Sequence, residues 1–320
     1  MCYSSRSSPM KSEIEVFAPA TVANVAAGFD VLGFALHRPG DTVLVEEGEG
    51  DGVEIVEITG DDGELPRAVA DNTAGIAAQA LLDHLGDRRG VRMHIHKGIP
   101  VGSGIGSSAC SAVAGAVAVN ELLGRPLQRP DLLPFALKGE AAASAGAIHA
   151  DNVGPSLLGG MVLVRSNAEL DTVNLPVPDQ LFAAVVLPRL KILTSMAREA
   201  LRTQVPLSDA VVQWGNLGGL VAGLARSDYG LIGRSLKDVV AEPYRAPLIP
   251  GFAAVRDAAL EAGALGCSIS GAGPAVFALC RGDESAFRVA IAMQKAFDAE
   301  GLPSERFVSS INPLGAQRIK

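Results

Sequence analysis

A glycine- and serine-rich segment, PVGSGIGSSACSA, constrains this chain more than any other stretch of its sequence. It stands between an alternating apolar run, 91–100, and an alanine-rich run, 108–124, that ends just before Pro126. The first run predicts a strand and the second predicts a helix. A glycine-rich turn that enters a helix presents free backbone N–H groups and the positive end of the helix dipole, and together these bind anions. The segment therefore predicts a phosphate site.

The spacing of the glycines excludes two common nucleotide-binding motifs. No lysine follows Gly106, as the P-loop requires, and the order G-x-G-x-G departs from the dinucleotide fingerprint. Glycines let the backbone approach a phosphate without a Cβ in the way, and the two serines that follow offer a hydroxyl to a magnesium ion. The alternative is a turn that only lets a helix pack closely. The predicted ATP-binding residues are Pro100, Val101, Gly102, Ser103, Gly104, Ile105, Gly106, Ser107, Ser108, Ala109 and Cys110.

Composition narrows the classes of partner and the compartment. The 320 residues are 48% hydrophobic, which is ample for one or two packed domains. A net charge of −8 argues against nucleic acid or an anionic membrane as the main partner, and no apolar run is long enough to span a bilayer. Four cysteines without a CxxC pair suit a reducing, cytoplasmic location. Residues 1–11 lack the apolar centre of a signal peptide and are expected to be a disordered or misassigned start.

Strand-like and helix-like runs interleave along the chain, which predicts an α/β or α+β protein. A polar stretch with two prolines, 167–180, separates a predicted N-terminal domain, 12–170, from a C-terminal domain, 171–320. Thr194 is expected to cap a short helix, and 267–280 reads as a hairpin with a glycine-rich bend. The patterns predict strands at 12–19, 41–47, 52–58, 159–166 and 181–188, and helices at 71–86, from 131, and at 209–224, 230–239, 253–262 and 285–301.

Two further segments, Ala18–Leu36 and Gly266–Leu279, accompany the glycine-rich one. In this order the three resemble the three motifs of the GHMP small-molecule kinases, and the resemblance runs from about Glu13 to Val308. ANVAAGFDVLG and HADNVGPSLLGG resemble the homoserine kinase branch of that family. The resemblance implies the α+β GHMP kinase fold. That fold pairs an ATP-binding N-terminal domain like ribosomal protein S5 domain 2, which contains a left-handed βαβ unit, with a ferredoxin-like C-terminal domain.

The activity implied by the resemblance is ATP-dependent phosphorylation of the L-homoserine hydroxyl to O-phospho-L-homoserine, a step of threonine biosynthesis. It implies that Ser108 and Glu140 bind Mg²⁺. Glu140 lies nine residues before His149, one more than the family pattern has, so a one-residue bulge or a shifted assignment both stay open. The alternative to metal binding is that Glu140 is a solvated glutamate on a helix surface.

An amino-acid substrate needs a cation for its carboxylate and acceptors for its ammonium group. Arg198 and Arg245 match the family's carboxylate ligands, because a guanidinium fork binds both oxygens. Asn24 and Asp30 match its ammonium ligands. The remaining implied contacts are His149 and Thr194 with the substrate and Asn72 with the adenine.

Asn152 and Arg198 are the implied catalytic residues. Asn152 stands where some GHMP kinases have an aspartate, and an amide cannot remove a proton but can orient the acceptor hydroxyl. In-line attack with late proton loss is then expected, because a loose phosphoryl-transfer transition state needs little activation of the nucleophile. Asp151 remains a possible base. The third motif is expected to close over the site and to position the phosphates and the glycine-rich loop indirectly.

Two other functions stay open. Another GHMP kinase, acting on a mevalonate-like or shikimate-like acceptor, would have no use for the pair formed by Asp30 and Asn24. A non-catalytic nucleotide-binding relative would not need Ser108 and Glu140. The family leans toward homodimers, so the resemblance implies a homodimer, although no residue pattern indicates one.

Overall fold

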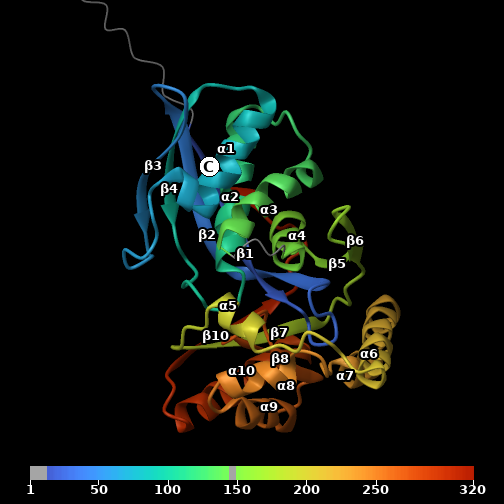
Figure 1. The fold of residues 1–320 in the computed structure, drawn as a ribbon. Helices are drawn as coiled ribbons and strands as arrows, with labels where there is room; N and C mark the ends of the chain where they lie inside the picture. Colours follow the sequence, from blue (N-terminus) through green and yellow to red (C-terminus); the bar gives the residue numbers. More distant parts are fainter. Residues whose placement is uncertain (1–12, 144–148) are drawn as a thin grey trace, which may run out of the picture.

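The computed structural model describes residues 13–143 and 149–320, so the expected irregular start at 1–11 lies outside the described residues. Two halves, each built on a sheet, stack on one another (Figure 1). The first half contains β1 (Glu13–Ala23), β2 (Leu32–Gly48), β3 (Gly52–Thr59), α1 (Thr73–Leu85), β4 (Gly90–His96), α2 (Ser107–Leu122), α3 (Leu133–Ala143), α4 (Ala150–Leu158), β5 (Met161–Ser166) and β6 (Asp171–Leu175). The second contains β7 (Leu181–Pro188), α5 (Thr194–Glu199), α6 (Leu207–Arg226), α7 (Tyr229–Ser235), α8 (Glu242–Arg245), α9 (Phe252–Glu261), β8 (Gly266–Ile269), β9 (Val276–Arg281), α10 (Asp283–Ala299) and β10 (Ser304–Ser310), and a short β11 (Gln317–Arg318) follows.

The sheet of the first half has seven strands in the order β11-β1-β2-β4-β3, with β5 also pairing with β2 and β6 pairing with β5. Strands β3 and β4 are parallel and are joined through α1, whereas the other neighbours are antiparallel. Helix α2 is composed of small residues and is buried along most of its length, so it packs directly against β1 and β2. The glycine-rich segment therefore connects a central strand to a buried helix.

The sheet of the second half is antiparallel throughout, in the order β10-β7-β9-β8. Numbered along the chain, this is the order 4-1-3-2, and helices occur after the first and the third strand. This is the ferredoxin-like arrangement that the resemblance implies. The predicted hairpin at 267–280 is β8 and β9, joined by the glycine-rich bend.

The boundary between the halves is less simple than the sequence indicates. Strand β6 falls inside the polar stretch 167–180 and pairs with β5, and β11 pairs with β1. Both strands lie beyond residue 170, yet both belong to the first sheet.

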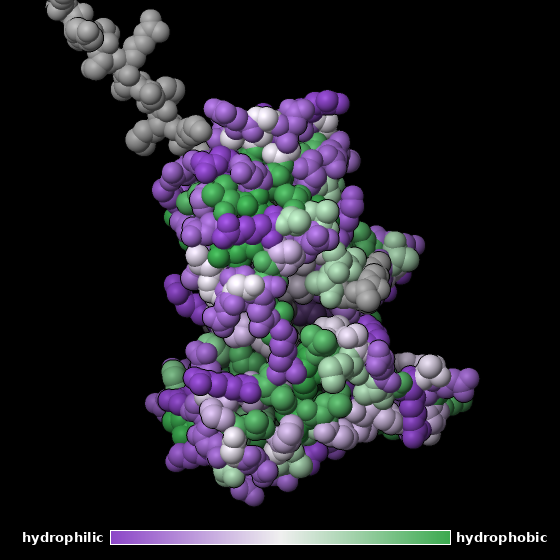
Figure 2. Space-filling view, turned by 60° about the vertical axis from the view of Figure 1, so that its left-hand side comes forward, coloured by the Kyte–Doolittle hydropathy of each residue, from purple (hydrophilic) through white to green (hydrophobic). Residues whose placement is uncertain are grey.

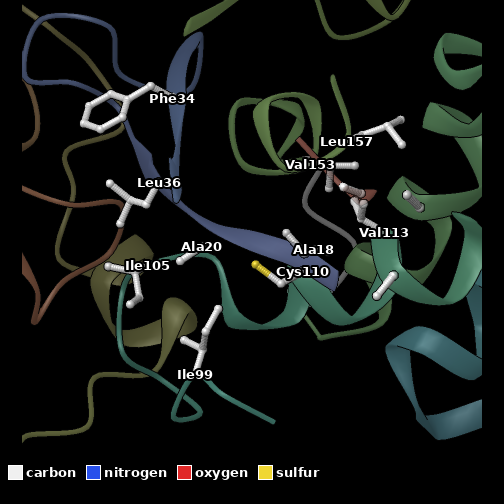
Figure 3. Packing of buried hydrophobic residues seen from close by; sticks show 14 of the residues in the cluster. Ala18, Ala20, Phe34, Leu36, Ile99, Ile105, Cys110, Val113, Val153 and Leu157 are labelled. Atoms are coloured by element: carbon white, nitrogen blue, oxygen red, sulfur yellow. The ribbon is translucent and has the colours of Figure 1, made fainter. Parts of the chain in front are cut away.

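A continuous hydrophobic core joins the two halves. Phe34 of β2 meets Phe277 of β9 edge to face, with ring centroids 6.1 Å apart. Figure 3 shows Leu36 between Phe34 and Ile105 of the glycine-rich loop, and Cys110 of α2 beside Ala18 of β1, all in one hydrophobic cluster. The loop is thus anchored in the packing between the halves.

Three local expectations need correction. The strand expected at 41–47 is the end of β2, which begins at Leu32. The segment HADNVGPSLLGG contains helix α4, which the sequence does not reveal because Pro155 lies inside it. Thr194 is the first residue of α5, whose N-cap is Leu193. Among the described residues, no helix combines the length and the hydropathy needed to cross a membrane.

Candidate active site

The glycine-rich loop joins β4 to α2, and its three glycines all have positive φ. A Cβ on Gly104 would lie 2.5 Å from the carbonyl oxygen of Gly273, and one on Gly106 would collide with the Thr21 side chain. A Cβ on Gly102 would lie 2.8 Å from the Lys191 side chain. The glycines are therefore required by close packing against other segments, in agreement with the structural alternative. Close packing and phosphate binding are compatible explanations for these glycines, because the same loop also borders a cavity.

The first turn of α2 is the part of the loop region whose geometry suits an anion. Its N-cap is Gly106, which has no side chain to cap the first N–H groups. The hydroxyl of Ser107 donates to the carbonyl of Ile99, and Ser108 lines the cavity beside the loop. A helix of this length with uncapped N–H groups that face a cavity suits a phosphate.

A buried ion pair supports this turn from behind. The Lys97 ammonium donates to the Asp41 carboxylate, to the Ser111 hydroxyl at 2.9 Å and to the Ser107 carbonyl at 3.0 Å. Asp41 also accepts from the Gly98 N–H and from the Ser111 hydroxyl. This network fixes β2, the start of the loop and α2 relative to one another. The sequence gives no sign of it, because nothing in a sequence pattern pairs Lys97 with Asp41.

The third motif holds both other motifs in place. The Ser270 hydroxyl donates to the Gly104 carbonyl at 2.8 Å, and the Ala275 N–H donates to the Ser103 carbonyl. The Asn24 amide donates to the Gly271 carbonyl at 3.0 Å. The expectation that this motif positions the glycine-rich loop agrees with these contacts.

The three motifs surround a cavity of about 550 Å³, and Figure 2 shows a hollow at the waist between the two halves. Residues from both halves line it, so a ligand here touches the glycine-rich loop and the second half at once. The predicted site residues that line the cavity are Asn24, Asp30, Asn72, Val101, Gly102, Ser103, Gly104, Gly106, Ser107, Ser108, Glu140, His149, Asn152, Thr194 and Arg245.

Five predicted residues lie elsewhere. The side chains of Ile105, Ala109 and Cys110 are in the hydrophobic core, so only their backbone is available to a phosphate. Pro100 lines a second cavity, of about 1040 Å³, that also contacts the loop. Arg198 does not line the first cavity but binds two residues that do.

Two arginines lie over one aromatic ring beside the cavity. The guanidinium groups of Arg198 and Arg245 lie 5.6 and 5.2 Å from the centre of the Phe29 ring. Arg245 is 5% exposed and donates to the carbonyls of Gly271 and Ala197. Phe29 is a site residue that the sequence analysis missed, although it lies inside the first motif.

Asp30 and Arg198 form a forked ion pair, with the shorter contact at 2.7 Å. Asn24 accepts from the Asp30 N–H at 3.0 Å, so the two predicted ammonium ligands also fix each other. Asp30 and Arg198 neutralise each other in this structure. A substrate that carries one positive and one negative charge can pair with both of them, so its binding leaves no charge without a counter-charge.

The chain of contacts continues from Arg198 to His149 and Glu140. His149 Nε2 lies 3.3 Å from Arg198 Nη2, and its Nδ1 lies 3.3 Å from Glu140 Oε1. Burial acts to lower the pKa of His149, but the hydrogen bond and charge of Glu140, together with the charges of Asp151 and Asp30, outweigh it, so the pKa rises. Glu140 is 5% exposed, which excludes the solvated-surface alternative. Its nine-residue spacing to His149 spans 144–148, which lie outside the described residues.

Asp151 and Asn152 begin α4 at the wall of the cavity. The Asn152 Oδ1 accepts from the Thr21 hydroxyl at 2.9 Å, close to Gly106. Asp151 is 2% exposed, and its Oδ1 has no hydrogen-bond partner in the described part of the chain. Burial, with the nearby charge of Asp30, raises the pKa of Asp151 to about 7.

The oxygen donors beside the cavity suit a hard divalent cation whose other ligands are phosphate oxygens. Across residues 13–143 and 149–320 there is no group of three or more His, Cys, Asp or Glu side chains that could hold a metal ion alone. Glu140 and Ser108 offer a carboxylate and a hydroxyl beside one cavity, which is what Mg²⁺ takes when nucleotide phosphates complete its shell.

Comparisons with known proteins agree with this geometry. The family models for the GHMP kinases N terminal domain and the GHMP kinases C terminal match residues 72–160 and 220–299. Homoserine kinases of Chlorobium phaeovibrioides and Chlorobaculum tepidum are 49% and 47% identical; the alignments cover 96% and 95% of this chain, and 99% and 97% of those proteins. The chain belongs to the homoserine kinases of the GHMP kinase family.

Solved structures extend this assignment to the fold. The homoserine kinase from Cytophaga hutchinsonii superimposes with a TM-score of 0.95 at 52% identity, covering 98% of this chain and 99% of that one. The galactokinase from Lactococcus lactis superimposes with a TM-score of 0.71 at 17% identity, covering 96% and 95%, and shares the fold alone. The GHMP kinase fold is thereby confirmed, and the chain is an enzyme of the kinase class.

Proposed function

We propose that this chain transfers the γ-phosphoryl group of ATP to the side-chain hydroxyl of L-homoserine, forming O-phospho-L-homoserine for threonine biosynthesis. One observation carries the proposal: the glycine-rich loop, which suits phosphates, and Arg245, which suits a carboxylate, line one cavity, and Arg198 lies near Arg245 over the same Phe29 ring. Family membership supports the choice of acceptor. The buried, unpaired thiols of Cys110, Cys267 and Cys280 suit a reducing compartment, and the cytoplasm is the proposed place of action.

The phosphates of ATP would lie against the loop and the uncapped first turn of α2. Ser108 and Glu140 would hold Mg²⁺, which neutralises phosphate charge when it is bound. Asn72 is a proposed neighbour of the adenine. Its own side chain caps α1 through the N–H groups of Ala74 and Gly75, so it would act there by shape rather than by a new hydrogen bond.

The homoserine carboxylate would bind Arg245 and Arg198. A buried guanidinium that donates only to carbonyls still needs a counter-charge, and the carboxylate supplies it. The ammonium group would bind Asp30 and Asn24, and the open Oδ1 of Asp151 adds a third acceptor. His149 and Thr194 would complete the wall around the substrate.

The acceptor hydroxyl would be oriented by Asn152. The Thr21 hydroxyl occupies one lone pair of the Asn152 Oδ1, so the amide is held in one orientation. A bond then forms between the hydroxyl oxygen and the γ-phosphorus while the bond to the ADP oxygen breaks. The proton passes to an oxygen of the transferred phosphoryl group, and Asp30 and Arg198 keep the substrate in line.

An ADP-release assay with Mg-ATP tests the acceptor. L-homoserine is compared with L-serine, L-threonine, mevalonate and shikimate as substrates. Strong turnover on L-homoserine alone is expected. Turnover on mevalonate or shikimate, which carry a carboxylate but no ammonium group, would keep the phosphate site but overturn the assignment of Asp30 and Asn24 as ammonium ligands. No turnover on any of the five would favour the non-catalytic alternative.

Variants test the individual roles. Arg245→Lys should raise the KM for L-homoserine and leave the KM for ATP nearly unchanged, because lysine cannot fork around a carboxylate. Arg88→Lys, on an exposed turn, is the matched control. Asn152→Ala should lower kcat, and an unchanged kcat would refute the orienting role.

A further inference from the structure

The second cavity, of about 1040 Å³, borders the glycine-rich loop and lies between the two halves. Three residues, Lys97, Val101 and Ser103, line both this cavity and the first one. Its volume is at the upper end of the range of small-molecule pockets. The proposed phosphoryl transfer uses the first cavity and does not account for the second.

Two buried hydroxyl groups that line the second cavity have no hydrogen-bond partner in the described part of the chain. They are Ser103 Oγ and Ser304 Oγ. Ser103 belongs to the loop and is 2% exposed, whereas Ser304 begins β10, so each half contributes one of them. A buried hydroxyl without a partner is unfavourable, and such groups are normally satisfied by protein, by water or by a bound molecule. These two hydroxyls therefore indicate a polar ligand in the second cavity.

Two arginines of the second half bring positive charge to this cavity. Arg189 directly follows β7, Arg306 lies in β10, and these two strands are neighbours in the sheet. The Arg306 guanidinium donates to the side-chain carbonyl of Gln294. Among the described residues, Lys191 forms an ion pair with Glu64 at this cavity, but neither arginine pairs with a carboxylate. A guanidinium that has no carboxylate partner suits a phosphate group, which it binds through two hydrogen bonds.

The carboxylates at the cavity differ in what they already bind. Asp61 accepts from a backbone N–H of its own loop at 3.0 Å, and Glu64 pairs with Lys191. Asp62 and Glu305 are exposed and can accept further hydrogen bonds, as carboxylates do from the hydroxyls of a ribose. Because the described residues contain no group of three or more His, Cys, Asp or Glu side chains that could hold a metal ion, these carboxylates do not indicate a cation site.

One part of the cavity wall is apolar. Leu187 of β7 and Val308 of β10 contribute to it, and so does Phe287 of α10, whose ring is on the surface and 55% exposed. Nucleic-acid bases stack on exposed aromatic rings, because stacking buries the flat faces of both. The ring therefore suits a ligand with a flat aromatic part.

We propose that the second cavity binds a nucleoside phosphate, at a site separate from that of the ATP which donates the phosphoryl group. Arg189 and Arg306 bind its phosphate groups. Asp62 and Glu305 accept from its ribose hydroxyls, and its base stacks on Phe287. Inorganic phosphate would use the two arginines alone, whereas a nucleotide uses the cations, the carboxylates and the ring together.

Equilibrium dialysis of the full chain against radiolabelled ADP with Mg²⁺, up to the millimolar range, tests the proposal. We expect two ADP molecules bound per chain, one in each cavity. The double variant Arg189→Ala/Arg306→Ala should bind one ADP, with the affinity of that remaining site and kcat unchanged, because neither arginine lines the first cavity. One ADP per chain in the wild type would overturn the proposal, and so would two in the double variant.

The double variant Arg88→Ala/Arg125→Ala is the matched control. It removes the same charge from two exposed arginines that line neither cavity, so it should still bind two ADP molecules. Circular dichroism of each variant separates loss of binding from loss of folding.

Two further measurements test the nucleoside part of the ligand. Phe287→Ser should weaken the second ADP site at least tenfold and leave the first unchanged, and an unchanged second site would contradict stacking on this ring. Pyrophosphate should displace the second ADP only at a concentration at least tenfold above that of unlabelled ADP. Equal displacement by the two compounds would show a site for anions in general and would overturn the assignment of a nucleotide.

Discussion

The buried carboxyl of Asp151 should make the stability of this protein depend on pH in an unusual direction. Burial, with the charge of Asp30, raises its pKa from 3.8 to about 7 in the folded protein. A folded state with the higher pKa keeps a proton that the unfolded chain has already lost. The free energy of unfolding therefore falls as the pH rises from about 4 to about 7, and it stays lowered by the full amount at higher pH.

The magnitude follows from the size of the shift. Each pKa unit corresponds to about 1.4 kcal/mol, so a shift from 3.8 to about 7 costs about 4 kcal/mol of folding free energy above neutral pH. Part of that cost is already present near pH 5, because the carboxyl of the unfolded chain is ionised there. Asp151→Asn removes the titrating group with little change in volume. The variant should be more stable than the wild type, and its advantage should widen by about 2 to 3 kcal/mol between about pH 5 and pH 8.

Urea unfolding followed by circular dichroism, at a series of pH values, measures this difference. Asp87→Asn is the matched control, because the hydrogen bond from Arg89 lowers the pKa of Asp87. A carboxyl with a lowered pKa is already ionised across the same pH range, so its contribution to the free energy of unfolding does not change there. The free energy of unfolding of the control should therefore differ from that of the wild type by a constant amount. Parallel curves for Asp151→Asn and the wild type would refute the reasoning.

Three other predictions concern the loop and its supports. Ser270→Ala removes the hydrogen bond to the Gly104 carbonyl and should raise the KM for ATP about fivefold while sparing the KM for L-homoserine, as steady-state kinetics would reveal. Glu140→Gln should raise the Mg²⁺ concentration needed for half-maximal rate without changing the circular dichroism spectrum; an unaltered Mg²⁺ titration would contradict the metal assignment. Lys97→Met leaves the buried Asp41 carboxylate without its cation and should cost about 3 to 5 kcal/mol in thermal or urea unfolding, whereas adding Asp41→Asn should recover much of the loss.

Local patterns carried much of the sequence prediction. Asn72 caps α1, and the glycine-rich segment joins a strand to a helix, because capping residues and small residues act within a few positions of themselves. The antiparallel hairpin of β8 and β9 follows for the same reason. Such signals need no knowledge of distant parts of the chain.

Contacts between distant segments account for what the sequence left open. Phe29 lies near Arg198 and Arg245, and Lys97 is paired with Asp41, only because the fold brings those segments together. The burial of Glu140 likewise depends on how its helix packs. The neighbouring sequence therefore could not distinguish a metal ligand from a charged surface residue at this position. Tertiary placement supplied these answers.

The pairing of β11 with β1 has a consequence for how this protein is made. Val16 and Phe17 lie opposite Arg318 and Gln317 in the sheet, so the first sheet is completed by residues synthesised after the whole second half. While the ribosome is still working, this edge of β1 lacks its last neighbour, and an unpaired edge recruits other strands. Assembly of the first sheet thus waits until β11 has been synthesised. A fragment that stops after β6 would carry that open edge permanently and should aggregate where the full chain does not.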